Sequence, residues 1–206
     1  MKIIGITGPT GAGKTTALEE LRALGAEVID ADAVYHRLLA EDRALGDRLE
    51  ELFGPLRDEG GDIDRKKLGA IVFGDPAQLE RLNAVAQRAA ADEVARLLRA
   101  HEAAGRPLAA VDAIALLESP LAGLCTDTVA VLAPPEVRVR RIMAREGIPE
   151  DYARARVAAQ KEDGFFRRGC RHVLDNDGDD PAAFAAEARA LFRHILSDPG
   201  ETGTKE

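Results

Sequence analysis

The clearest chemical pattern in this sequence lies near its start, between Gly8 and Thr15. The segment Gly-Pro-Thr-Gly-Ala-Gly-Lys-Thr fits the pattern G-x4-G-K-[ST], which is typical of a phosphate-binding loop. Its glycines allow backbone N–H groups to turn toward phosphate oxygens, and a helix that follows directs its positive end at them. In this pattern Lys14 reaches the outer phosphates and the Thr15 hydroxyl ligates Mg²⁺. We therefore expect a nucleoside triphosphate site rather than a glycine turn with a chance Lys-Thr pair.

Three aspartates are spaced so that they would meet the bound phosphates. Asp30 and Asp32 follow one apolar run, and Asp112 ends another. At the carboxyl ends of parallel strands, one of the first two could accept a proton from an attacking hydroxyl, and Asp112 could hold Mg²⁺ through water. Alternatives stay open, because Asp32 could cap the helix that begins at Ala33, and Asp112 could merely close its strand. Glu118 is a weaker candidate for a metal or substrate contact.

A basic segment runs from Arg138 to Arg171, where nine arginines and one lysine stand against five acidic residues. Arg141 and Arg145 are four residues apart on one predicted helix, and a second Arg-bearing helix follows a Gly-Ile-Pro turn. Such a helix pair is typical of a mobile lid that brings positive charge onto a transferring phosphoryl group. We expect Arg145 to act at the site. Arg138, a turn or more earlier, is expected to be a solvated surface charge.

The apolar pattern predicts an α/β fold that places these residues together. A strand, loop, helix and strand occupy the first 30 residues and imply parallel pairing. Further apolar runs predict strands at 2–7, 27–30, 108–112, 128–132 and 172–176. Helices are predicted at 14–24, 76–104, 135–145 and 149–160, with Asp64 capping another and Asp180-Pro181 opening the last. The polar residues 197–206 are expected to be a disordered tail.

Composition narrows the class of protein. The 206 residues are 46% apolar and 31% charged, as in an ordinary folded domain, and two cysteines are too few for a disulfide framework. A formal net charge of −8 argues against a nucleic-acid partner, and no apolar stretch is long enough to cross a membrane. We expect a cytoplasmic protein. The sequence lacks the Asn-Lys-x-Asp motif by which GTPases recognise guanine, and the chain is too short for a helicase or a transporter ATPase. Among proteins with a phosphate-binding loop, a small-molecule kinase remains.

Five ordered segments together resemble one family. They are GITGPTGAGKTT, EVIDADAVYH, FGPLRDEGGDIDRKKLGAIVF, RRIMAREGIPEDYARARVAAQ and VLDNDGD. This set is similar to the dephospho-coenzyme A kinases, from the first strand to about Leu196. The resemblance implies phosphoryl transfer from Mg-ATP to the ribose 3′-hydroxyl of dephospho-coenzyme A, which completes coenzyme A. It implies a P-loop kinase core with a five-stranded parallel sheet (1–32, 106–134 and 171–196), a helical substrate-binding insert (about 33–105) and an Arg-bearing lid (about 141–165).

The resemblance also assigns roles to individual residues. It makes Asp32 the acid beside the acceptor hydroxyl, Arg145 a lid arginine, and Asn176 a neighbour of the adenine. The expected partners are ATP and dephospho-coenzyme A, with Mg²⁺ as cofactor, and the chain is expected to be a monomer. The ATP-binding set is Gly8, Gly11, Ala12, Gly13, Lys14, Thr15, Thr16, Arg141 and Asn176. The substrate-binding set is Asp32, His36 and Arg65, and the metal set is Thr15 and Asp112.

The sequence departs from the family pattern at three places. Ala86-Gln87 stand where His-Pro is usual, Ala113 to Leu116 follow Asp112 where x-Pro-Leu-Leu is usual, and Cys170-Arg171 stand where Ala-Asp is usual. All but the last lie on the expected substrate side. Two alternatives therefore stay open: a nucleotide-binding relative with altered catalysis, and a kinase of another small alcohol or nucleotide.

Overall fold

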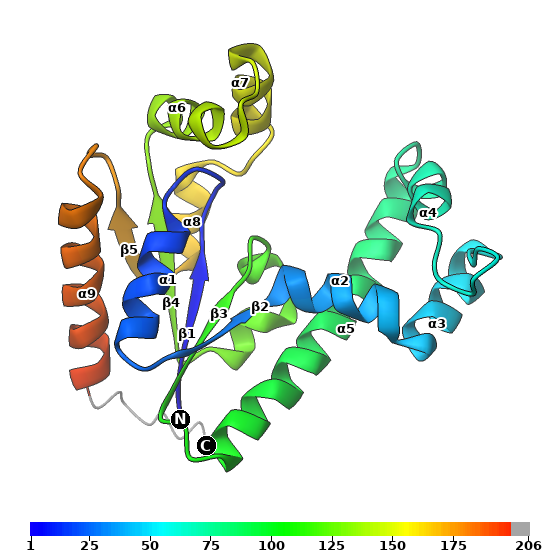
Figure 1. The fold of residues 1–206 in the computed structure, drawn as a ribbon, viewed down its shortest axis with the longest axis horizontal. Helices are drawn as coiled ribbons and strands as arrows, with labels where there is room; N and C mark the ends of the chain where they lie inside the picture. Colours follow the sequence, from blue (N-terminus) through cyan, green and yellow to red (C-terminus); the bar gives the residue numbers. More distant parts are fainter. Residues whose placement is uncertain (199–206) are drawn as a thin grey trace.

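A five-stranded parallel sheet forms the centre of the computed structural model, which describes residues 1–198 (Figure 1). Its strands are β1 (Lys2–Thr7), β2 (Glu27–Asp30), β3 (Leu108–Asp112), β4 (Asp127–Leu132) and β5 (His172–Asp175). They lie in the order β2-β3-β1-β4-β5, and every neighbouring pair is parallel. The predicted strands are confirmed, although β4 begins one residue earlier and β5 ends one residue earlier than expected. All five carboxyl ends therefore meet at one edge of the sheet.

Helices cover both faces of the sheet, which is why its three central strands, β3, β1 and β4, are mainly apolar. Helices α1 (Lys14–Ala23) and α9 (Pro181–Ser197) pack on one face, where Leu21 and Phe192 belong to the same buried core as Ile4 and Ile6 of β1. The C-terminal half of α5 (Pro76–Ala103) and the 3-10 helix η2 (Pro120–Leu124) cover the other face over β2 and β3. A short helix that the sequence pattern did not predict, α8 (Asp163–Gly169), packs its Phe166 beneath β4.

A helical insert, residues 31–103, projects to one side of the sheet (Figure 1). It consists of α2 (Ala31–Glu41), α3 (Arg43–Phe53), α4 (Arg65–Val72) and α5. Each begins after an aspartate whose carboxylate accepts from backbone N–H groups of the first turn: Asp30, Asp42, Asp64 and Asp75. The insert has a small core of its own around Leu49, Leu56, Leu68 and Val72. The boundary expected between residues 32 and 33 falls inside α2.

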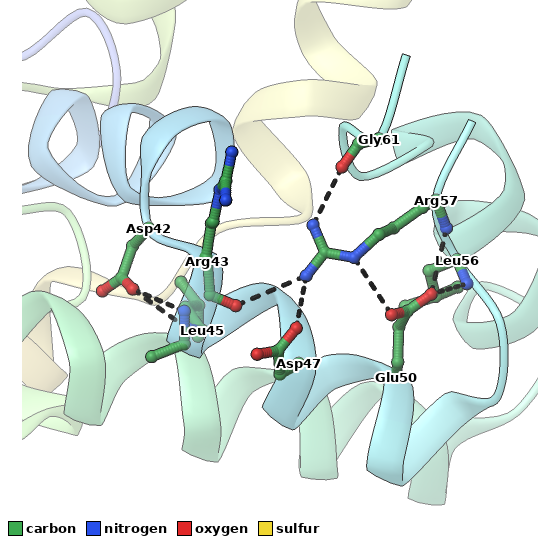
Figure 2. A network of polar contacts seen from close by, with 9 residues as sticks. Asp42, Arg43, Leu45, Asp47, Glu50, Leu56, Arg57 and Gly61 are labelled. Atoms are coloured by element: carbon green, nitrogen blue, oxygen red, sulfur yellow. Dashed lines mark hydrogen bonds and ion pairs between the residues drawn. The ribbon is translucent and has the colours of Figure 1, made fainter. Parts of the chain in front are cut away.

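Arg57 holds the loop between α3 and α4 in place (Figure 2). Its guanidinium donates to Glu50 Oε2 at 3.1 Å, to Asp47 Oδ1 at 2.6 Å and to the Gly61 carbonyl at 2.8 Å. Glu50 Oε1 in turn accepts from the Leu56 N–H at 2.8 Å. The loop leads directly into α4, so this network fixes the position at which α4 begins.

Helices α6 (Pro135–Glu146) and α7 (Glu150–Ala158) form a pair above the carboxyl edge of the sheet (Figure 1). Gly147 joins them in the left-handed conformation, with φ of 67°, and ends α6. Val139, Ile142, Ala153 and Val157 form a separate small core between the two helices. The expected lid boundary at residue 141 falls inside α6, so the helix continues without a break from the sheet into the pair.

The last helix extends one residue into the predicted disordered tail. Helix α9 includes Ser197, where the disordered tail was expected to begin, and Ser197 Oγ donates to the His194 carbonyl at 2.9 Å. The rest of that predicted tail, residues 199–206, lies outside the described part of the chain. Among the described helices, none combines the length and the apolar composition that a membrane span requires.

Candidate active site

The loop between β1 and α1 has the geometry that its glycines predicted. Gly8, Gly11 and Gly13 have φ values of 137°, 83° and 106°, a region of backbone space that other residues rarely adopt. A Cβ on Gly8 would lie 2.1 Å from the Val131 carbonyl oxygen, so the first turn of the loop needs glycine for space as well. Gly13 precedes α1, and no side chain caps that helix terminus. The positive end of the helix is thereby left for an anion.

Three side chains from later in the chain hold successive carbonyls of this loop. The Thr10 carbonyl accepts from Arg138 Nε at 3.0 Å, and the Ala12 carbonyl accepts from Asn176 Nδ2 at 2.8 Å. Between them, the Gly11 carbonyl accepts from Arg141 Nη1 at 3.4 Å. Arg141 also donates to Asn176 Oδ1 at 3.1 Å, which links two predicted ATP-binding residues to each other.

Arg138 corrects a prediction. It was expected to be a solvated surface charge, yet only 3% of it is exposed. Arg138 does precede Arg145 on the predicted helix, but α6 packs directly on the phosphate loop, and Arg138 lies on the side of α6 that faces this loop. A Cβ on Gly11 would lie 3.1 Å from the Arg138 Cα, which shows how closely helix and loop approach. The sequence carries no local signal for this burial.

A cleft of about 370 Å³ opens between the phosphate loop, the end of β3 and the α6–α7 pair. Its lining residues are Thr10, Gly11, Gly13, Lys14, Thr15, Asp112, Ile114, Arg141, Arg145 and Arg156. The cleft therefore brings together predicted residues from three distant segments of the chain. Seven other predicted residues lie outside its lining: Gly8, Ala12, Thr16, Asp32, His36, Arg65 and Asn176.

Lys14 and Asp112 influence each other electrostatically in this cleft. Burial lowers the pKa of Lys14, and the negative charges of Asp112 and Asp32 oppose that effect. Burial raises the pKa of Asp112 to about 6, although the positive charge of Lys14 acts in the opposite direction. Asp112 Oδ1 is buried without a hydrogen-bond partner in the described part of the chain. A buried carboxylate oxygen left in this way is suited to a cation or its water.

The residues present fit a magnesium site that depends on the nucleotide. Thr15 offers an exposed hydroxyl to the same cleft as the unpartnered oxygen of Asp112. Within residues 1–198, no group of three or more His, Cys, Asp or Glu side chains could hold a metal ion. Mg²⁺ prefers oxygen ligands and keeps waters, so phosphate oxygens and water would have to complete its coordination.

Asp30 caps helix α2 and Asp32 does not, so the alternative in which Asp32 is only a helix cap is wrong. Helix α2 begins at Ala31, and its cap is Asp30, whose Oδ1 accepts from the Ala33 N–H at 2.9 Å. Asp32 lies in the first turn and does not cap the helix. Its pKa is raised, first by burial and then by the charge of Asp30, while Lys14 and His36 act to lower it. The Asp32 carboxylate is therefore not committed to the backbone of α2.

The two other predicted substrate-binding residues lie on the insert. His36 follows Asp32 by four residues on α2, which places both on one face of the helix. Arg65 begins α4, and its Nη2 donates to the His36 carbonyl at 3.2 Å. Both side chains are exposed. The contact ties the start of α4 to α2.

A carboxylate that the sequence pattern missed organises the arginines of the α6–α7 pair. Glu146 Oε1 accepts from Arg145 at 2.6 Å, and Glu146 Oε2 accepts from Arg156. These hydrogen bonds, with that from Arg145 as the larger cause, lower the pKa of Glu146. Arg156 reaches the cleft beside Arg145, whereas Arg154 turns away to Glu136 and Glu150. The ion pair between Arg156 and Glu146, which crosses the turn between the two helices, holds Arg156 on the side of Arg145.

Comparison with known proteins agrees with this geometry. A family model described as dephospho-CoA kinase matches residues 2–181. The chain is 34% identical to a dephospho-CoA kinase of Dehalococcoides mccartyi over 178 residues, which are 86% of this chain and 89% of that protein. A solved structure from Thermus thermophilus is similar with a TM-score of 0.72 at 36% identity, over 97% of this chain and 98% of that one. A solved dephospho-CoA kinase structure from Campylobacter jejuni has a TM-score of 0.60 at 23% identity, over 94% of this chain and 97% of that one. At that identity it shows the shared fold alone.

Proposed function

Because the chain belongs to the dephospho-CoA kinase family, we propose that it transfers the γ-phosphoryl group of ATP to the ribose 3′-hydroxyl of dephospho-coenzyme A. The product would be coenzyme A, so this is the last step of coenzyme A biosynthesis. The observation that carries the proposal is the cleft, which joins the phosphate loop, Lys14, Asp112 and Arg145. Those are the groups that phosphoryl transfer needs for positioning and charge stabilisation.

The donor side of the reaction is assigned to the phosphate loop and the arginines. Backbone N–H groups of the loop and Lys14 Nζ would bind the phosphate oxygens of ATP. Arg145 and Arg156 would stabilise the negative charge that spreads over the transferring group. Thr15 and Asp112 would hold Mg²⁺, which when bound neutralises charge between the β- and γ-phosphates. Lys14 and the arginines hold positive charge at fixed positions around the phosphoryl group, which bulk water cannot do.

The acceptor side of the reaction is assigned to Asp32. The ribose 3′-oxygen attacks the γ-phosphorus while the bond from that phosphorus to the β–γ bridging oxygen breaks, and ADP leaves. The hydroxyl proton passes to the Asp32 carboxylate. Asp32 is suited to this because Asp30, and not Asp32, is used as the helix cap. His36 and Arg65 would contact the rest of the acceptor from the insert.

Incubation with Mg-ATP and a panel of acceptors tests this function. The panel is dephospho-coenzyme A, adenosine, AMP and pantetheine, with ADP release followed over time and the gain of one phosphate confirmed by mass spectrometry. We expect phosphate transfer to dephospho-coenzyme A and little to the others. Transfer only to another acceptor would assign a different kinase activity. ATP binding without transfer to any acceptor would favour the catalytically altered relative.

The same proposal includes a cytoplasmic monomer. The low cysteine content suits a reducing compartment, and one chain by itself brings Lys14, Asp112 and Arg145 into the same cleft. Light scattering coupled to size exclusion chromatography checks the monomer, whose mass would be 22.0 kDa.

A further inference from the structure

Thr10, within the phosphate loop, is held by two residues that lie more than a hundred positions later in the chain. Its carbonyl accepts from Arg138 Nε at 3.0 Å, and its N–H donates to Gln160 Oε1 at 3.1 Å. Its hydroxyl accepts from Gln160 Nε2 at 2.8 Å. Arg138 also donates to Gln160 Oε1, so the three residues form one closed network. We call this network the Thr10 clamp.

The clamp contains a buried positive charge without an opposite charge beside it. Arg138 is 3% exposed, and no carboxylate of residues 1–198 forms an ion pair with it. Its hydrogen-bond acceptors are the neutral oxygens of Thr10 and Gln160. Burial lowers the pKa of Arg138, and only the more distant charge of Asp163 opposes this effect. A buried charge with neutral partners is unfavourable for stability, so packing alone does not account for an arginine at this position.

The clamp joins the phosphate loop to both ends of the α6–α7 pair. Arg138 lies in the first turn of α6, and Gln160 follows α7 by two residues. The segment between them carries Arg145 and Arg156 into the cleft. A change in the position of the pair relative to the sheet would therefore act on Thr10 from both sides.

The orientation of the Thr10 peptide affects the phosphate site directly. In a trans peptide the C=O and the next N–H point in opposite directions. While Arg138 holds the Thr10 carbonyl, the Gly11 N–H is directed away from Arg138. Gly11 itself lines the cleft. The clamp thus fixes the direction of an N–H group in the loop that binds phosphate.

We propose that Arg138 and Gln160 are positioning residues that orient the Thr10 peptide for ATP and couple the phosphate loop to the α6–α7 pair. This inference rests on the proposed function, because it takes the loop to bind ATP. Both residues hold the phosphate loop, which is assigned to ATP, so we expect their effect on ATP binding and not on dephospho-coenzyme A binding.

Calorimetric titration with ATP, together with steady-state kinetics, tests the proposal in Arg138→Met and Gln160→Met. Arg138→Met loses hydrogen bonds from a charged group, so we expect its Kd and KM for ATP to rise roughly 10–100-fold. The KM for dephospho-coenzyme A should stay within about twofold of wild type. The matched control is Arg140→Met on the same helix, because Arg140 is 60% exposed and pairs with the exposed residue Asp179 at 3.2 Å. Wild-type ATP affinity in Arg138→Met would overturn the proposal.

Two further measurements separate a positioning role from a merely structural one. Deuterium exchange of the nucleotide-free protein should be faster at residues 8–13 in both clamp variants, and unchanged in Arg140→Met. The double variant should bind ATP no more weakly than the weaker single variant, since the two residues act through one group. Additive losses would overturn the coupling. If Arg138→Met does not fold, Gln160→Met alone decides: wild-type ATP affinity and loop exchange in that variant reject the clamp.

The outcome is distinguishable from failure of the proposed function. Binding and exchange are measured without turnover, so they report on the clamp even if dephospho-coenzyme A is not the acceptor. Conversely, wild-type turnover with unchanged ATP binding in the clamp variants would leave the proposed function standing and reject the clamp.

Discussion

Lys14 Nζ donates a hydrogen bond to the Gly8 carbonyl at 2.7 Å and so spans the loop that it follows. A second contact reaches the Pro9 carbonyl at 3.4 Å. The ammonium group is thereby held over the phosphate loop, where burial lowers its pKa and the charge of Asp112 opposes that shift. A charge held in advance stabilises a phosphoryl transition state without reorganisation at the moment of reaction.

Lys14→Ala is expected to keep the fold and lose most of the activity. The loss of one preorganised charge should lower kcat roughly 10²–10³-fold. Kinetics of ADP release and a thermal melt measure the two effects. Lys2→Ala is a matched control, because Lys2 lies at the other end of β1 and pairs with Asp127 at 3.4 Å. A folded Lys14→Ala protein with near-normal turnover would contradict the assignment of the nucleotide site.

Asp32→Asn and Asp30→Asn should behave very differently. If Asp32 accepts the ribose proton, its amide cannot, and kcat should fall roughly 10²–10⁴-fold with ATP affinity unchanged. Asp30→Asn should change stability little, because Asn caps helices about as well as Asp, whereas Asp30→Ala should cost about 1 kcal/mol. That loss lowers the Tm by about 2–4 °C in a chain of this size. Normal turnover in Asp32→Asn would refute the catalytic role.

The pH dependence of kcat/KM for dephospho-coenzyme A should show an acid limb set by Asp32. Burial and the charge of Asp30 raise the pKa of Asp32. The proton acceptor must be ionised, so activity falls as pH drops through a value above the ordinary aspartate pKa of about 3.9. Mg²⁺ is kept saturating, because Asp112 has a pKa of about 6.

Asp30→Asn provides the internal check on this pH profile. Removing the neighbouring negative charge should lower the pKa of Asp32 and move the acid limb to lower pH. A limb that stays in place in Asp30→Asn would assign it to another group.

Arg145→Ala should lower kcat much more than Arg154→Ala. Arg145 lines the cleft, and removing one group that stabilises transition-state charge costs roughly 10²–10³-fold. Arg154 bonds Glu136 at 2.7 Å and Glu150 at 2.8 Å and is absent from the lining of the cleft, so its loss should leave turnover near wild type. Single-turnover rates at saturating ATP compare the two variants. Equal small effects would mean that Arg145, like Arg154, contributes only surface charge.

Arg57→Met should weaken acceptor binding without affecting ATP. The Arg57 network fixes the loop that leads to Arg65, a predicted contact of dephospho-coenzyme A (Figure 2). Misplacing that contact should raise the KM for dephospho-coenzyme A on the order of tenfold. The KM for ATP should not change, and deuterium exchange should be faster at residues 54–64. Unchanged acceptor KM alongside faster exchange would remove Arg65 from the acceptor site.

Local sequence pattern determined the sheet and the phosphate loop. The apolar runs predicted β1 and β3 at their observed bounds, because a strand covered on both faces needs apolar residues whatever its neighbours are. The short β2 was also predicted at its observed bounds. The glycine spacing predicted the loop, since φ values near 100° are available only to glycine at little cost. Asp64 was also predicted correctly as a cap, because the capping hydrogen bonds reach only two or three residues along the chain.

Tertiary structure decided the environment of individual charged residues. Asp30 and Asp32 are equally good caps by type, and only the place where β2 leaves the sheet decided that α2 begins between them. Arg138 and Arg140 are equally polar in sequence, yet one is buried against the phosphate loop and the other is exposed. Burial of a helical residue depends on what packs against that turn of the helix. For Arg138 the partner is Thr10, which lies 128 residues away, and no local pattern encodes that contact.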